Sequence, residues 1–143
     1  MSELGAHTFE EHTGEVEIHL RAADLAALLA EAGHALAELL IGDGSAGGTP
    51  SGPDAAREPV HVVSTDRAAL VVDWLNELIY RSETRKRVYR RFQLEVAGER
   101  EVRGEIEGFP AEELRTQVKA ATLHRLQVQP APEGMRAVVV LDV

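Results

Sequence analysis

The sequence predicts an α+β fold of two layers, with two helices packed on one side of a mixed, mostly antiparallel sheet. This prediction follows from a segment near the start in which apolar and polar residues alternate, two segments with apolar residues at helical spacing, and a hairpin pattern in the second half. The expected order of elements is β-α-β-α-β-β-β-β. Because 143 residues suffice for one hydrophobic core, we expect residues 1–143 to form a single domain.

The first strand and the first helix are predicted from the residues before position 42. Residues 14–22 alternate apolar with polar side chains, which is typical of a half-buried strand. Asp24 then stands where a helix N-cap is expected, and leucines recur at helical spacing up to Gly42. The pattern therefore predicts a helix over about 24–41.

Residues 42–59 read GDGSAGGTPSGPDAAREP and contain no large apolar side chain. Such a segment buries too little surface to offset the entropy of ordering it, so we expect a flexible loop. A boundary between two domains is less favoured, because the residues before this loop are too few to fold alone. A short strand is predicted directly after it, over 60–63.

A second helix is predicted over about 66–82, capped by a Ser-Thr-Asp cluster that ends at Asp66. Its apolar residues form two adjacent stripes, and Trp74 lies at the centre of one of them. We interpret Trp74 as a core residue.

The remaining strands are predicted from the second half of the chain. Apolar residues of one parity in 88–96 and in 102–106, with a turn around Gly98 between them, indicate a β-hairpin. The segment 116–128 fits either a helix or a strand. The apolar run 137–143 is typical of a central strand that is buried on both faces.

Composition excludes several classes of function. The chain has 24 acidic and 15 basic residues and a formal charge of −9, so its surface repels phosphate, and we expect RNA contact to be indirect or weak. With no cysteine, disulfides, thiolate metal sites and a cysteine nucleophile are excluded. We find no phosphate loop, dinucleotide fingerprint, HExxH or GxSxG motif. No signal peptide or membrane span is visible, so we expect a cytoplasmic protein that does not contact a membrane.

The basic segment 85–91 is interleaved with Tyr89 and is followed by Phe92, which superficially resembles an RNA-binding strand. The alternative is a charged edge strand, whose charges prevent pairing with another sheet. We favour the edge strand.

Two carboxylates are candidates for a metal site. Asp142 ends an apolar strand beside the terminal carboxylate of Val143, and Glu15 begins the first strand beside His12. If the first and last strands are neighbours, these oxygen atoms would form a pocket suited to Ca²⁺ or Mg²⁺. A strand end with solvated carboxylates is the alternative. Lys119 stands out in a segment poor in charge, although a solvent-facing lysine would explain it equally well.

Four segments, taken in order, resemble the motifs of the archease family. His12–Val16 is similar to its opening H-T-A-D motif, and Val72–Tyr80 matches its helix motif almost unchanged. Val118–His124 is similar to its I-K-A-V-T-Y-H segment, and Val140–Val143 matches its ending. Together these motifs span nearly the whole chain.

The resemblance implies a small α+β protein that is not itself an enzyme. Archeases serve as protein cofactors of the tRNA-splicing RNA ligase, whose guanylylation and turnover they promote. The resemblance further implies a divalent metal, calcium before magnesium or manganese, held by Glu15, Asp142 and Val143. Lys119 corresponds to the family's ligase-activating lysine, and His12 and His124 are further candidates for activating the partner. The oligomeric state is left open.

The chain departs from the family pattern at three places in these motifs. Glu15 replaces the usual Asp, Gly14 replaces Ala, and Leu123 replaces Tyr. Two other functions remain open: a chaperone-like interaction protein, and a metal-dependent hydrolase that uses the same carboxylates. A chaperone would expose a contiguous apolar patch. A hydrolase would need His12 or His124 as its general base.

Overall fold

The computed structural model describes residues 5–42, 55–111, 114–132 and 134–143, and the side chains of residues 123–127 lie outside this description. Its elements in chain order are β1 (Gly5–His12), β2 (Glu15–Ala22), α1 (Leu25–Ile41), β3 (Ala56–Val63), α2 (Arg67–Arg85), β4 (Arg87–Ala97), β5 (Glu101–Pro110), β6 (Ala120–Ala131) and β7 (Gly134–Asp142). Among the described residues, no helix has the length and apolar character needed to cross a membrane.

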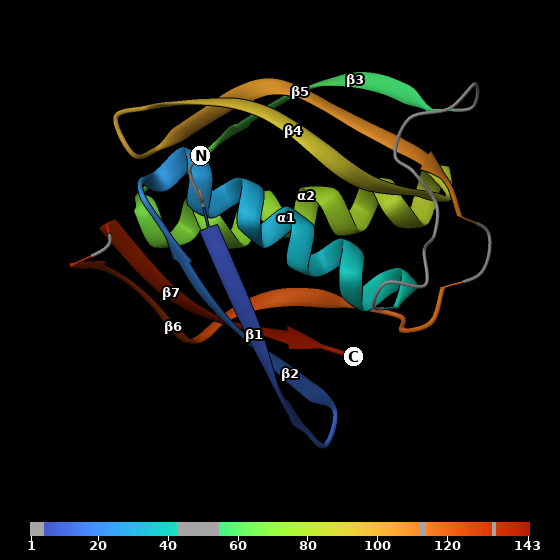
Figure 1. Cartoon of the computed structure of the whole chain (residues 1–143), viewed down its shortest axis with the longest axis horizontal. Helices are drawn as coiled ribbons and strands as arrows, with labels where there is room; N and C mark the ends of the chain where they lie inside the picture. Colours follow the sequence, from blue (N-terminus) through green and yellow to red (C-terminus); the bar gives the residue numbers. More distant parts are fainter. Residues whose placement is uncertain (1–4, 43–54, 112–113, 133) are drawn as a thin grey trace.

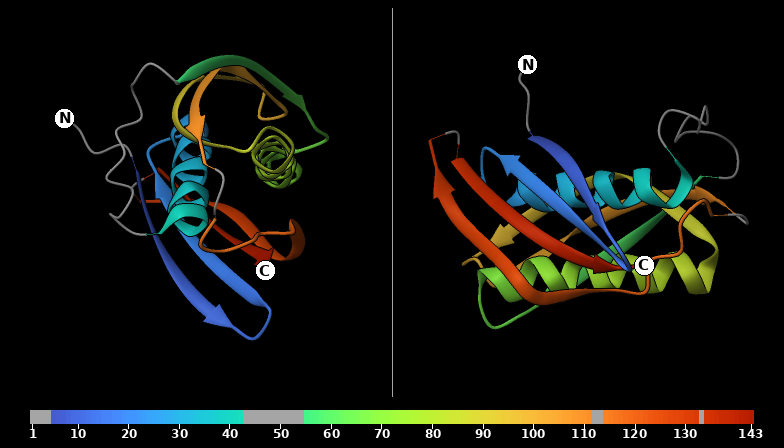
Figure 2. Two further views of the ribbon diagram at one scale, coloured as in Figure 1. Left: turned by 90° about the vertical axis from the view of Figure 1, so that its right-hand side faces the viewer. Right: turned by 90° about the horizontal axis from the view of Figure 1, so that it is seen from below.

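The strands form two antiparallel sheets, one in the order β1-β2-β7-β6 and the other in the order β3-β5-β4. Figures 1 and 2 show α1 and α2 between the two sheets, and each helix contacts strands of both. The α+β class, the two helices and the order β-α-β-α-β-β-β-β from Glu15 onward are confirmed. The structure adds β1 in front of this order and has two sheets, one on each side of the helices, where we expected one.

The second sheet has a physical reason in the helix sequences. In α1 the consecutive residues Ala35, Leu36 and Ala37 are all buried, and in α2 the same is true of Leu70 and Val71. Consecutive residues lie about 100° apart around a helix, so these helices are apolar over more than one face. A single sheet would leave part of that surface in water.

Strand β1 was not predicted, because Phe9 is its only large apolar residue. It pairs with β2 through a two-residue turn, which sets His12 opposite Glu15. Gly14 in this turn has a φ of 77°, a conformation that glycine adopts without strain. The replacement of the family's alanine by Gly14 therefore suits the turn.

Both predicted helices are confirmed with their caps. The Asp24 and Asp66 side chains each accept a hydrogen bond of 2.8 Å from a backbone N–H three residues later. Gly42 ends α1 as predicted. Helix α2 extends past residue 82 to Arg85, where Lys86 takes a left-handed conformation with a φ of 54° and ends it.

The predicted loop 42–59 is only partly within the description, because residues 43–54 lie outside it. Its last part requires a correction: Ala56–Pro59 belong to β3, which we expected to begin at residue 60. Proline is tolerated there because β3 is an edge strand of its sheet.

The segment 116–128, which fitted either a helix or a strand, is a strand from Ala120 onward. Strand β7 is central in its sheet, as predicted for the apolar run at the end of the chain.

Trp74 is fully buried, which confirms it as a core residue. Its indole N–H donates a 2.8 Å hydrogen bond to the carbonyl of Leu29 in α1. Its ring packs edge-on against Phe92 of β4, with 5.9 Å between ring centroids. Phe92 in turn lies over Gly33, where a Cβ atom would come within 2.4 Å of the ring. The Trp74 side chain thus joins both helices to the three-stranded sheet.

His7 of β1 lies between two carboxylates of α1. Its Nδ1 is 2.5 Å from Glu31 and its Nε2 is 2.8 Å from Glu38, so the doubly protonated ring can donate to both. The hydrogen bond to Glu31 is the main cause that raises the pKa of His7. The neighbouring imidazole of His34, 3.9 Å away, and the hydrogen bond from His7 lower the pKa of Glu31 to about 2. These contacts hold the edge strand against the helix.

We expect His7→Gln to destabilise the protein by about 1.5–3 kcal/mol near pH 6, the range for hydrogen bonds to charged groups. Because the pKa of His7 is raised above 6.5, this contribution is complete below pH 6.5 and is lost as pH rises through the folded-state value. The Glu31 contribution is present above pH 4.5 and is lost as pH falls towards 2. Urea denaturation of both proteins at pH 6 and pH 9 measures the difference. A difference in the free energy of unfolding between the two proteins that is larger at pH 9 than at pH 6 would contradict this account.

Candidate functional site

The register of β2 and β7 places Glu15 directly opposite Asp142. The backbone N–H of Val143 donates a 3.1 Å hydrogen bond to the carbonyl of Gly14 in the hairpin turn. In the right-hand view of Figure 2 the end of β7 lies beside the β1–β2 hairpin, where this pairing and hydrogen bond join them. The condition set by the sequence, that the strands carrying Glu15 and Asp142 be neighbours, is therefore met. Both side chains are half-buried.

Lys119 reaches the same end of the sheet through its backbone. Its N–H donates a 2.8 Å hydrogen bond to the carbonyl of Asp142, and the next residue, Ala120, is the β6 partner of Asp142. The Lys119 side chain is exposed. His12 lies opposite Glu15 across the hairpin. His124 lies in β6 among the residues whose side chains are outside the description.

Asn76 was not predicted as a site residue, yet it holds the strand that follows Lys119. Its amide donates a 3.2 Å hydrogen bond to the Ala121 carbonyl, and its Oδ1 accepts a 2.8 Å hydrogen bond from the Ala121 N–H. The helix motif and the lysine segment are therefore joined directly. An Asn in the middle of a long helix was the available signal, since such residues are disfavoured there unless they bind a partner.

We expect Asn76→Ala to destabilise the protein by about 1–3 kcal/mol, because it leaves the Ala121 backbone groups without this partner. Amide hydrogen exchange at Ala121 should accelerate, while the core amides of α1 change less. Urea denaturation and exchange measured by NMR check both effects. Gln93→Ala, which removes an exposed amide from β4, is the matched control and should leave stability within about 0.5 kcal/mol. Equal effects of the two variants would contradict the role of Asn76.

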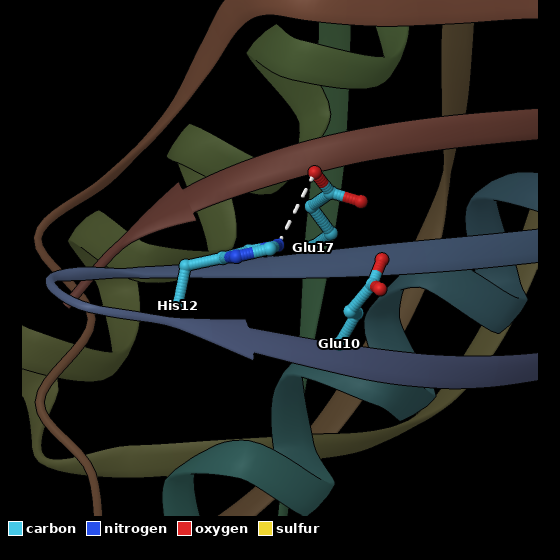
Figure 3. A group of neighbouring side chains, drawn as sticks. All are labelled: Glu10, His12 and Glu17. Carbon is cyan, nitrogen blue, oxygen red and sulfur yellow. Dashed lines mark ion pairs between the residues drawn. The ribbon is translucent and has the colours of Figure 1, made fainter.

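A second group of donors lies on the hairpin face that carries Glu15. Glu10, His12 and Glu17 each offer a ligand atom, and these atoms lie within 4.8 Å of one another (Figure 3). His12 Nε2 is 3.5 Å from a Glu17 oxygen, and His19 Nε2 is 3.2 Å from the other Glu17 oxygen. Of these residues the sequence singled out only His12. The alternation of Glu and His along both strands was the missed signal, because it is recognisable only once β1 is known.

Only the part of the basic segment 85–91 from Arg87 onward lies in an edge strand, β4, as preferred, because Arg85 ends α2 and Lys86 caps that helix. Arg85 pairs with Glu58, and Arg91 lies 3.7 Å from Glu107 of the neighbouring strand. Burial and the hydrogen bond to Glu58 raise the pKa of Tyr89 to about 12. These groups contact other parts of the same chain.

The fold and the side chains at this end of the sheet define the class: a small α+β protein whose carboxylates and imidazoles gather at one hairpin. The model of the "Archease protein family (MTH1598/TM1083)" matches residues 7–143. The chain belongs to the archease family.

Relatives and solved structures agree with this assignment. A protein named archease from Methanosarcina acetivorans is 28% identical over 145 residues, which cover 96% of this chain and 95% of that protein. The archease of Methanosarcina barkeri is 34% identical over 98 residues, covering 63% of this chain and 66% of that protein.

Two solved structures show the same fold. The solution structure of Methanobacterium thermoautotrophicum protein 1598 has a TM-score of 0.70 at 20% identity and covers 96% of this chain and 98% of that chain. The crystal structure of TM1083 from Thermotoga maritima, described as an archease and possible chaperone, has a TM-score of 0.62 at 19% identity and covers 94% of each chain.

Proposed function

We propose that this chain is a non-catalytic activator of a tRNA-splicing RNA ligase in the cytoplasm, which promotes guanylylation and turnover of that enzyme. The observation that carries the proposal is the pairing of Glu15 with Asp142, beside Val143 and the backbone of Lys119. Membership of the archease family supports the ligase as partner. RNA contact would be indirect or weak, because the chain carries a formal charge of −9.

A divalent cation fits the donors at this sheet end. Glu15, Asp142 and the carboxylate of Val143 offer only oxygen, the ligand type that Ca²⁺, Mg²⁺ and Mn²⁺ prefer. Two carboxylates on directly paired residues repel each other, and a cation between them would offset that repulsion. Glu15 is one methylene longer than the aspartate of the family motif, and its side chain is half-buried. When bound, the metal would supply positive charge.

The residues of this chain would then act by presenting charged and polar groups to the ligase. The exposed Lys119 ammonium offers a positive charge to the partner, and Asn76 fixes the strand beside it. His12, opposite Glu15, and His124 on β6 are further contact candidates. Binding of this surface would favour the guanylylation-competent state of the ligase by shifting its conformational equilibrium.

The test is guanylylation of the ligase from the same genome, measured with labelled GTP, with and without this chain. We expect stimulation of at least tenfold, and loss of most of it after calcium is removed by a chelator and the assay is run in metal-depleted buffer containing only Mg²⁺. No stimulation by the folded protein would contradict the ligase proposal. Stimulation that survives calcium removal would contradict only the choice of calcium.

A chaperone-like function is the second candidate, because the Thermotoga maritima structure is described as that of a possible chaperone. The large apolar side chains that are exposed in the described part of the chain are Val63 of β3, Tyr80 of α2 and Leu114 in the segment between β5 and β6. Dispersed apolar residues are ordinary on a monomer surface. Suppression of the aggregation of an unrelated protein at stoichiometric amounts would favour this function over the first.

A further inference from the structure

We propose a second metal site, for a transition ion such as Zn²⁺, on the outer face of the β1–β2 hairpin. Its ligands are Glu10, His12, Glu17 and His19 (Figure 3 shows the first three). This site shares no residue with the oxygen-only group of Glu15, Asp142 and Val143. It is independent of the ligase proposal, because it rests only on the geometry of the hairpin.

The hairpin register brings the four side chains to one face. Glu10 is directly opposite Glu17, His12 is opposite Glu15, and successive ligands on each strand lie two residues apart. Side chains two residues apart on a strand point to the same face. The directly opposed Glu10 and Glu17 are a like-charge pair, which is unfavourable unless a cation or a protonated histidine compensates.

Three histidine–glutamate contacts within the group have the separation of two ligands on a tetrahedral ion. His12 Nε2 and His19 Nε2 lie 3.5 and 3.2 Å from the two oxygens of Glu17, and His19 Nε2 lies 3.6 Å from Glu10. Two ligands at about 2.0–2.1 Å from a tetrahedral Zn²⁺ are themselves about 3.4 Å apart. Glu10, His12 and Glu17 already offer donor atoms within 4.8 Å of one another, and His19, which lies within 3.6 Å of both glutamates, would complete the set by a rotation of its side chain.

The donor set determines the kind of ion. Two imidazoles and two carboxylates form a mixed nitrogen and oxygen set, which suits Zn²⁺, Co²⁺ or Ni²⁺ better than Ca²⁺. The Glu17 side chain is only 13% exposed, so one ligand is already partly shielded from water, while His12 and His19 remain accessible at 43% and 44%. A metal ion can therefore enter from solvent and bind the partly shielded carboxylate of Glu17.

The experiment is a titration of the untagged protein with Co²⁺, followed by the visible d–d absorption of tetrahedral cobalt, and then displacement by Zn²⁺. We expect one Co²⁺ per chain, with affinity reduced at least tenfold in His19→Gln and in His12→Gln. His61→Gln is the matched control, because His61 also pairs with a glutamate on an exposed sheet face, 2.5 Å from Glu101. It should bind as the wild type does.

Three outcomes would overturn the proposal: no Co²⁺ or Zn²⁺ binding at millimolar metal, equal binding by His19→Gln and wild type, or loss of the cobalt spectrum in Asp142→Asn alone. The last would place the ion at the carboxylate site. Circular dichroism of each variant establishes that it is folded. Because the readout is the metal spectrum, failure of this site leaves the ligase assay unaffected.

Discussion

Asp142→Asn is expected to abolish the stimulation of ligase guanylylation and to weaken Ca²⁺ binding at least tenfold. The substitution keeps the size of the side chain and removes its charge, so one of the two directly paired carboxylates is lost. The backbone carbonyl that accepts from Lys119 is unchanged, so β6 and β7 should stay paired. Isothermal titration with Ca²⁺ and the labelled-GTP assay measure the two effects separately.

Two further variants make this result specific. Glu95→Gln removes one carboxylate charge from an exposed position on β4, in the other sheet, and should leave both measurements unchanged. Glu15→Asp restores the aspartate of the family motif and should retain stimulation. Full stimulation by Asp142→Asn would show that the paired carboxylates are not needed for activation.

Trp74→Ala is expected to destabilise the protein by about 3–5 kcal/mol, the range for removing a buried aromatic side chain. Trp74 is fully buried, and its loss would leave a cavity where α1, α2 and β4 meet. It would also remove the hydrogen bond to the Leu29 carbonyl and the packing partner of Phe92. Since domains of this size are stable by about 5–15 kcal/mol, the variant would lose a large part of its stability.

Urea denaturation followed by circular dichroism is the appropriate measurement, because Trp74 is the only tryptophan and its fluorescence disappears with it. Trp74→Phe is the matched variant, because it keeps an aromatic ring but loses the hydrogen bond. It should lower the free energy of unfolding clearly less than Trp74→Ala does. A loss below about 1 kcal/mol for Trp74→Ala would mean that the surrounding side chains close the cavity.

The helices could be predicted because their signals are local. Asp24 and Asp66 cap helices within three residues of themselves, and Gly42 ends α1. The α+β class followed from these helices and from the alternation in the strands. The same local patterns named Glu15, Asp142 and Lys119, because the motifs that carry them are short segments.

Other features depended on strand pairing between distant residues. Strand β1 has little apolar pattern of its own and is defined by its partner β2 and by His7 between two glutamates of α1. Asn76 looked like a surface residue until β6 was placed beside α2.

By itself, the sequence determined the two helices, the α+β class and the residues that carry the family motifs, because capping, periodicity and motif spacing act over a few positions. Only the tertiary structure decided how the strands divide between two sheets, that Glu15 faces Asp142, and that Glu10, His12, Glu17 and His19 meet on one face. Sheet register is set by contacts between segments far apart in the chain, and a shift of one residue would turn every side chain to the opposite face.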